Sequence, residues 1–121
     1  MPLVKINCLK VWKSSEKKII HDAVHKALVD AFHIEDWDYF HRFQEFDSED
    51  FLYPSYKNSK FMIIEIAVFP GRTEEMKAAL YKNICSNLSS LGLTPDDIFI
   101  QLTEQPICNW GIGGKIKGTN N

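Results

Sequence analysis

The sequence predicts an α+β fold, in which a four-stranded mixed sheet carries two helices on one face. Four segments show the alternation or the β-branched and aromatic content of strands, and two segments carry apolar residues at helical spacing. The two halves also repeat at an offset of about 60 residues, so that Val4 and Ile6 correspond to Ile64 and Ile66. Two strand–helix–strand units in tandem, each with a right-handed crossover, produce such a sheet.

The first unit covers about residues 2–46. Residues 2–9 alternate, with Val4, Ile6 and Cys8 on one side, which is typical of a strand. Ser14 and Ser15 followed by Glu16 predict a helix start with a serine cap. Apolar residues then recur on one helical face, at Ile20, Val24, Ala27, Leu28, Ala31 and Phe32. The aromatic-rich segment 38–46 is predicted to be the second strand.

The second unit covers about residues 61–104 and follows a polar, turn-rich loop over residues 47–60. Residues 61–69 have the clearest strand pattern, which Pro70-Gly71 ends. Thr73 is predicted to begin the second helix and Gly92 to end it. Its buried face is predicted at Met76, Leu80, Ile84, Leu88 and Leu91, and the fourth strand at Ile98, Ile100 and Leu102. Residues 105–121 form a glycine-rich C-terminal arm, expected to be a short hairpin.

Size and composition exclude several classes of protein. A chain of 121 residues is expected to form a single domain, and 45% apolar with 25% charged residues is typical of a globular protein. A net charge of −2 argues against a nucleic-acid partner, because phosphate binding requires an excess of basic residues. Three dispersed cysteines predict neither a disulfide framework nor a structural zinc site. With no apolar run of membrane-spanning length and no signal-peptide pattern, we expect a cytoplasmic protein with no membrane partner.

The sheet face opposite the helices is also apolar, at Leu3, Phe61, Ile63, Ala67 and Phe69. Such a patch is larger than a monomer usually exposes, and this favours an oligomer in which another subunit covers it. The alternative is that the loop over residues 47–60 or the C-terminal arm covers this face.

Pro2 is the first candidate for chemistry. Removal of Met1 would leave a secondary amine at the start of a strand, with an α-amino pKa that burial or a nearby cation lowers towards neutrality. Such an amine serves as a general base or a nucleophile. The alternative is that proline is merely a common second residue, and a retained Met1 would leave the nitrogen as a non-basic amide.

Arg72 and Asp38 are candidates for the same site. Arg72 lies between a strand end and a helix start, where a guanidinium binds a carboxylate with two parallel hydrogen bonds. Alternatively, it is a surface residue paired with Glu74 or Glu75. Asp38 either orients a water molecule or is a turn residue at the exit of the first helix.

Arg42 and the histidines of the first helix allow further interpretations. Arg42, in the second strand, either binds an anion or pairs with an acid such as Glu45 or Glu65. His21 and His25 are four residues apart and could share a metal, but without an acidic partner at that spacing we expect a solvated helix flank and no metal site.

Several motifs occur in order along almost the whole chain: Pro2, residues 38–42, residues 47–51 with 53–56, residues 69–72 with Lys77 and residues 80–81, residues 102–104, and residues 109–111 with Gly113. In this order and spacing the chain resembles the tautomerase superfamily, and within it the malonate semialdehyde decarboxylase-like tautomerases. The resemblance implies the tautomerase/MIF-like fold and a homotrimer. It also implies that no metal or organic cofactor is needed.

The same resemblance implies roles for particular residues. Pro2 would be the catalytic residue, Arg72 the binder of a small carboxylate substrate and Asp38 their polar partner, while Trp110 and Ile112 would wall the pocket. One position departs from the decarboxylase pattern, because Pro70 stands where that enzyme has a second arginine. Tyr39 and His41 also replace residues that are more often Arg and Gln in relatives.

The sequence therefore predicts a cofactor-free keto–enol tautomerase that acts on small α-keto or enol carboxylates with Pro2 as general base. Two alternatives remain open. One is a hydratase or decarboxylase that acts on three-carbon acids through the same proline. The other is a non-catalytic binding module of ferredoxin-like shape.

Overall fold

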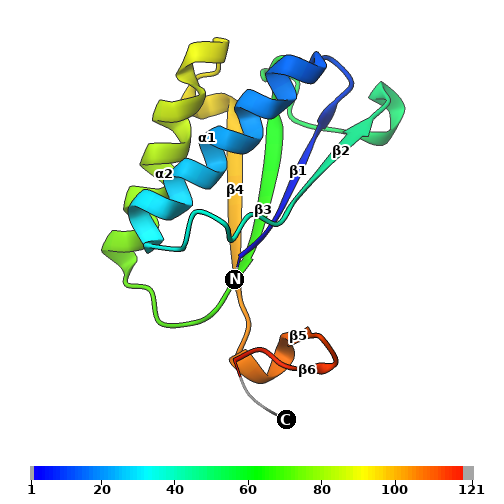
Figure 1. Ribbon diagram of the computed structural model, residues 1–121. Coiled ribbons are helices and arrows are strands. Elements are labelled where there is room, and N and C mark those ends of the chain that lie inside the picture. Colours follow the sequence, from blue (N-terminus) through cyan, green and yellow to red (C-terminus); the bar gives the residue numbers. More distant parts are fainter. Residues whose placement is uncertain (1, 119–121) are drawn as a thin grey trace.

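A computed structural model describes residues 2–118, and Figure 1 shows a sheet with both helices on one face. The four strands are ordered β2-β1-β3-β4. The elements are β1 (Leu3–Leu9), α1 (Ser14–Phe32), β2 (His41–Phe46), β3 (Met62–Val68), α2 (Glu74–Leu88), β4 (Ile98–Glu104), β5 (Gly111–Ile112) and β6 (Lys115–Ile116). The predicted fold class and the mixed sheet are confirmed.

The two halves meet through their first strands. β1 and β3 pair antiparallel in the centre of the sheet, and each pairs parallel with the outer strand of its own unit. Val4 lies opposite Ile66, and Ile6 lies opposite Ile64. These four side chains are almost fully buried beneath the helices, so the residues of the sequence repeat form the centre of the core.

The helix boundaries differ slightly from the predicted ones. The predicted serine cap is wrong, because Lys13 is the N-cap residue and its backbone N–H donates to Glu16 Oε1 over 2.9 Å. The acid in the first turn thus accepts the backbone N–H of the N-cap residue, as the acid of a capping box does. The cap at Thr73 is confirmed, since its hydroxyl accepts from the Met76 N–H at 3.2 Å. Gly92, with φ of +79°, ends a short 3₁₀ turn that follows α2.

The second strand begins later than predicted, at His41 instead of Asp38. The Asp38 N–H donates to the Glu35 carbonyl and the Tyr39 N–H to the Trp37 carbonyl, at 3.0 and 2.8 Å. These N–H groups therefore bond backwards within a turn and do not pair with β1. Asp38 is a buried turn residue ahead of β2, not the first residue of a strand.

The sheet face opposite the helices is covered in part by the chain itself. Phe61 is only 5% exposed, because Phe51 and Tyr53 of the preceding loop pack on its ring at centroid distances of 6.4 and 5.6 Å. The proposed cover by the loop is thus correct at this end of the face. Leu3 remains 40% exposed and Phe99 on β4 61% exposed, so these parts of the face are open on a single chain.

Two further findings concern the ends of the chain and membranes. The C-terminal arm forms the expected hairpin, β5 paired with β6, and the arm's last residues, 119–121, lie outside the described part, as does Met1. Among residues 2–118, no helix is both long enough and apolar enough to cross a bilayer.

Candidate functional site

The start of β1 and the ends of β3 and β4 lie at the same edge of the sheet. Leu3 pairs with Ala67, and Val68 pairs with Glu104, so Pro2 precedes β1 where β3 and β4 end. Pro2 is buried there. In Figure 1 this edge is the one from which the arm with β5 and β6 extends. The topology therefore brings Pro2, the turn after β3 and the C-terminal arm to one place.

Arg72 is held in the turn between β3 and α2. Its Nη1 donates to the Phe69 carbonyl over 3.2 Å, and its Cζ lies 5.0 Å from the ring centroid of Phe32 at the end of α1. The guanidinium is thus half-buried against an aromatic face, which favours a fixed orientation. Its remaining N–H groups are sufficient in number for a bidentate bond to a carboxylate.

Trp110 closes one side of this turn. Its ring meets the Phe69 ring edge-on, with centroids 5.1 Å apart and an angle of 83°, and its indole N–H donates to the Gln105 carbonyl over 3.2 Å. Trp110 is 9% exposed, whereas Ile112 in β5 is 49% exposed. Of the two predicted wall residues, the structure places Trp110 against the turn and leaves Ile112 exposed at the surface.

Asp38 comes before β2 in the chain, and Arg42 is the second residue of that strand. Because β1 and β2 are parallel, with Val4 opposite His41, Asp38 lies at the sheet edge that also carries Pro2. Arg42 is exposed, pairs in register with Lys5 and faces away from the helices. On a single chain, Arg42 is therefore not brought to the site of Arg72, which packs against α1.

Glu104 is a residue that the sequence reasoning did not assign to the site. It ends β4 beside the turn, and its carboxylate accepts from Lys77 Nζ at 2.8 Å. Its pKa is lowered chiefly by the Lys77 hydrogen bond, and also by the charge of Lys77, by Gly71 and by the charge of Arg72. The sequence signal that could have identified Glu104 is an acid at the end of the strand predicted to lie beside the Pro-Gly-Arg turn.

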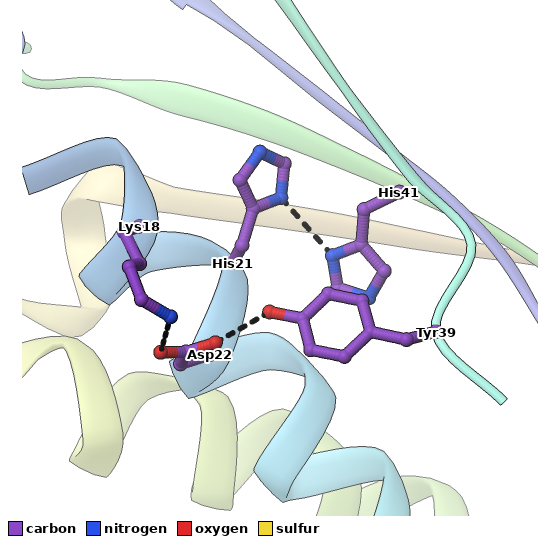
Figure 2. Close-up of polar contacts among 5 residues, drawn as sticks. All are labelled: Lys18, His21, Asp22, Tyr39 and His41. Carbon is purple, nitrogen blue, oxygen red and sulfur yellow. Dashed lines mark hydrogen bonds and ion pairs between the residues drawn. The ribbon is translucent and has the colours of Figure 1, made fainter. Parts of the chain in front are cut away.

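A cluster of histidines lies between α1 and the beginning of β2, as Figure 2 shows in part. His21 Nδ1 lies 3.1 Å from His41 Nδ1, and Tyr39 stacks on His25 with ring centroids 4.0 Å apart. The Tyr39 hydroxyl donates to Asp22 Oδ1 over 2.6 Å. The expectation of a solvated helix flank is wrong for His25, which is 5% exposed, because Tyr39 and His41 cover this part of α1.

Burial lowers the pKa of two histidines of this cluster, His21 and His41. It lowers the pKa of His41 to about 3, with the nearby His21 and His25 as further causes, and it also lowers the pKa of His21. A metal-binding histidine normally donates its second ring N–H to an acceptor. His41 Nε2 is buried and has no hydrogen-bond partner among residues 2–118, so the pair fits a neutral hydrogen bond better than a metal site.

We expect His41 to make the fold sensitive to acid. Its native pKa lies below the value of about 6.5 for the unfolded chain, so the unfolded state binds the extra proton first. Stability is thus fully present above pH 6.5 and decreases as the pH falls towards 3. One such group changes the free energy of unfolding by at most about 1.4 kcal/mol per pH unit. Because His41 is partly exposed, we expect a smaller total loss, about 1 kcal/mol between pH 7 and pH 5.

Urea unfolding of wild type and His41→Gln at several pH values measures this effect. The glutamine variant should show a flatter dependence of unfolding free energy on pH. The matched control is His33→Asn, which changes an exposed histidine at a left-handed position that asparagine tolerates. If His33→Asn flattens the profile and His41→Gln does not, His41 is not the source.

Comparison with known proteins now identifies the family. The model of a family described as "Tautomerase enzyme" matches residues 38–113. The chain is 28% identical over 123 residues to the probable tautomerase YusQ of Bacillus subtilis (strain 168), an alignment that covers 93% of this chain and 94% of that protein.

Solved structures agree with this family. Malonate semialdehyde decarboxylase, whose crystal structures are described as a basis for its decarboxylase and hydratase activities, superposes with a TM-score of 0.85 at 25% identity, over 92% of this chain and 90% of that chain. A fused 4-OT, described as an asymmetric trimer, superposes with a TM-score of 0.83 at 19% identity, over 94% of each chain, and supports the fold alone. The chain belongs to the tautomerase family, on its malonate semialdehyde decarboxylase-like branch, and is an enzyme of the tautomerase class.

Proposed function

We propose that this protein is a cofactor-free keto–enol tautomerase of small α-keto or enol carboxylates, with Pro2 as general base. The observation that carries the proposal is that Pro2, buried at the start of β1, lies at the sheet edge from which the Arg72 turn departs. A base and a carboxylate binder at one edge are what the conversion of an enol acid requires.

In the proposed reaction Pro2 has lost the preceding Met1 and is a free secondary amine. Its nitrogen takes the proton of the enol hydroxyl, the carbonyl forms, and the resulting ammonium returns a proton to the neighbouring carbon. Arg72 binds the carboxylate and stabilises the enolate-like charge that develops next to it. Trp110, packed on Phe69, limits access of water on one side.

Asp38 is proposed as the polar partner of Pro2, because it is buried at the same edge. Arg42 and Ile112 remain candidates for substrate binding only if a neighbouring subunit brings them to the site, since both are exposed on one chain. We propose a homotrimer, supported by the open apolar part of the sheet face and by the trimeric fused 4-OT relatives. One domain over residues 1–121 and a cytoplasmic location are part of the same proposal.

The first experiment follows ketonisation of an enol carboxylate, phenylenolpyruvate, by ultraviolet absorbance with wild type and Asp38→Asn. A tautomerase should accelerate the reaction above buffer and retain activity in Asp38→Asn, since proton transfer by Pro2 needs no activated water. Intact mass of the same sample reports whether Met1 is present.

The relatives' chemistry supplies the competing outcome. Malonate semialdehyde decarboxylase is described with decarboxylase and hydratase activities, and a hydratase must activate water. The lyase alternative would be favoured if the protein adds water to a three-carbon acid, or removes carbon dioxide from it, and if Asp38→Asn abolishes that activity.

We expect decarboxylation to be the weaker activity, because Pro70 leaves Arg72 as the only arginine of this turn and the carboxylate is then held less firmly. No reaction of either kind would favour a binding module.

A further inference from the structure

The segment over residues 33–40 links the end of α1 to the start of β2 and carries Asp38. Asp38 is 7% exposed, whereas its neighbour Trp37 is 67% exposed. The segment thus buries an acid and leaves a large apolar side chain in solvent. Burial of a carboxylate costs free energy, so contacts elsewhere in the segment must hold Asp38 in place.

The end of this segment is tied to β1. The Val4 N–H donates to the Phe40 carbonyl over 3.0 Å, directly before His41 pairs with Val4 in register. Val4 comes only two residues after Pro2 in the chain. The place of Asp38 relative to Pro2 therefore depends on how the remainder of the segment is held.

Side chains at the segment and on α1 hold that remainder. The Tyr39 hydroxyl donates to Asp22 Oδ1 over 2.6 Å, as Figure 2 shows, and the Tyr39 ring stacks on His25 with an angle of 24° between the ring planes. His25 Nε2 lies 2.8 Å from the carbonyl oxygen of Asp36, and it must be the donor because a carbonyl only accepts. The residue directly after Asp38 is thus attached to α1 both by a hydrogen bond and by a ring contact.

The acceptor of the Tyr39 hydrogen bond is well suited to fix a geometry. Asp22 lies near the middle of α1, on a regular helix, and also accepts from Lys18 Nζ at 3.1 Å. Its pKa is lowered, chiefly by the Tyr39 hydrogen bond and also by Lys18, so the acceptor is an ionised carboxylate. Hydrogen bonds to a charged acceptor are shorter and stronger than those between neutral groups.

We propose that Tyr39 is a positioning residue for catalysis: by its bond to Asp22 and its stack on His25, it fixes the place of Asp38 at the sheet edge that carries Pro2. The proposal rests on the proposed function, in which Asp38 is the polar partner of Pro2. When Pro2 takes the enol proton it becomes an ammonium, and a fixed carboxylate at the same edge stabilises the positive charge that develops. Tyr39 does not touch the substrate and acts through Asp38.

This role predicts a loss in kcat and not a rise in KM. Arg72, the proposed binder of the substrate carboxylate, is held by other contacts, with the Phe69 carbonyl and the Phe32 ring. Asp38→Asn removes the charge and should lower kcat about tenfold, to a rate still above that of the buffer. Tyr39→Phe keeps the ring and the charge of Asp38 but frees the segment, so kcat should fall less, about fivefold.

The test measures kcat and KM for phenylenolpyruvate with wild type, Tyr39→Phe, Asp38→Asn and the double variant. KM should stay within about twofold of wild type in Tyr39→Phe, while kcat falls. The double variant should lie within about twofold of Asp38→Asn, because a residue that acts through Asp38 adds little once the charge is gone.

Variants of α1 remove or keep the same bond from its other side. Asp22→Ala removes the acceptor at an exposed position and should match Tyr39→Phe. Asp22→Asn keeps an acceptor oxygen and should recover most of the lost kcat. Lys18→Met is the matched control, since it removes the other partner of Asp22 and leaves the Tyr39 bond, and its kcat and KM should equal those of wild type.

Several results would overturn the positioning role. One is a kcat of Tyr39→Phe that equals the wild-type value. Another is a fivefold loss from Tyr39→Phe that persists in full in the Asp38→Asn background, because Tyr39 would then act on something else. A third is an equal loss in Lys18→Met and Asp22→Ala, which would make the surface of α1 responsible. If Tyr39→Phe does not fold, as thermal unfolding would show, Asp22→Ala decides by the same criteria.

The same variants separate this inference from the proposed function. If Asp38→Asn leaves kcat unchanged, the proposed function is wrong at Asp38 and the role of Tyr39 is refuted with it. If Asp38→Asn lowers kcat and Tyr39→Phe does not, only the positioning role is wrong. Wild-type activity in Pro2→Ala would show instead that the general base itself is wrongly assigned.

Discussion

Pro2→Ala is expected to lower kcat/KM for an enol carboxylate by about 10²- to 10⁴-fold, the usual contribution of a positioned general base. Alanine also leaves an α-amino group after removal of Met1, but that group is a primary amine that rotates freely about its bond to Cα. The proline nitrogen is fixed in its ring, and Pro2 itself is buried directly before β1. The measurement is the ketonisation rate of matched samples whose N-termini have been confirmed by intact mass.

A second N-terminal variant tests the nitrogen itself. If a large residue is inserted between Met1 and Pro2, Met1 is retained and the Pro2 nitrogen becomes a tertiary amide without basicity. We expect this variant to lose activity to the buffer rate while its circular dichroism spectrum stays that of the wild type. Full activity with an acylated Pro2 would refute the general-base role, whatever Pro2→Ala does.

Arg72→Ala is expected to cause the second-largest loss, about 10²-fold in kcat/KM on enol carboxylates, mostly through KM. Charge-assisted bidentate bonds to a carboxylate are among the strongest in proteins, and removal of the guanidinium leaves the substrate anion without its partner. Arg72→Lys should recover only part of the loss, because an ammonium keeps the charge but lacks the planar fork. Initial rates over a range of substrate concentrations separate KM from kcat.

Arg42 provides the internal comparison, since the chain contains only two arginines. Arg42→Ala removes the same kind of charge from the exposed face of β2 and should change KM by less than Arg72→Ala. A larger effect at Arg42 than at Arg72 would mean that the substrate carboxylate binds at the other face of the sheet, between subunits.

Most elements of the fold could be predicted because their patterns are local. The apolar stripe of α1 ends at Phe32 in both the sequence and the structure, and Thr73 caps α2 as its side chain predicts. The start of β2 could not be predicted, because the aromatic content of residues 38–40 resembles a strand while the N–H groups of Asp38 and Tyr39 bond backwards in a turn. Composition does not reveal which carbonyl an N–H group reaches.

The polar surroundings of the site were harder to predict for a different reason. His21 and His41 are 20 residues apart in sequence and meet only because β2 packs beneath α1. Glu104 reaches Lys77 of α2 only because β4 ends beside β3, where the turn to α2 departs. Both contacts depend on strand order and register, which the spacing of residues in a single sequence does not give.

The antiparallel pairing of β1 with β3 has a consequence for how many reactive centres one chain can have. The internal pseudo-twofold relates Pro2 to Met62, which begins β3 at the far edge of the sheet. At that edge the corresponding nitrogen is an ordinary peptide amide in mid-chain, and the rings of Phe51 and Tyr53 pack on the ring of the preceding residue, Phe61. The strand–helix–strand repeat therefore copies the backbone framework at both ends of the sheet, but an N-terminal nitrogen can lie at only one of them.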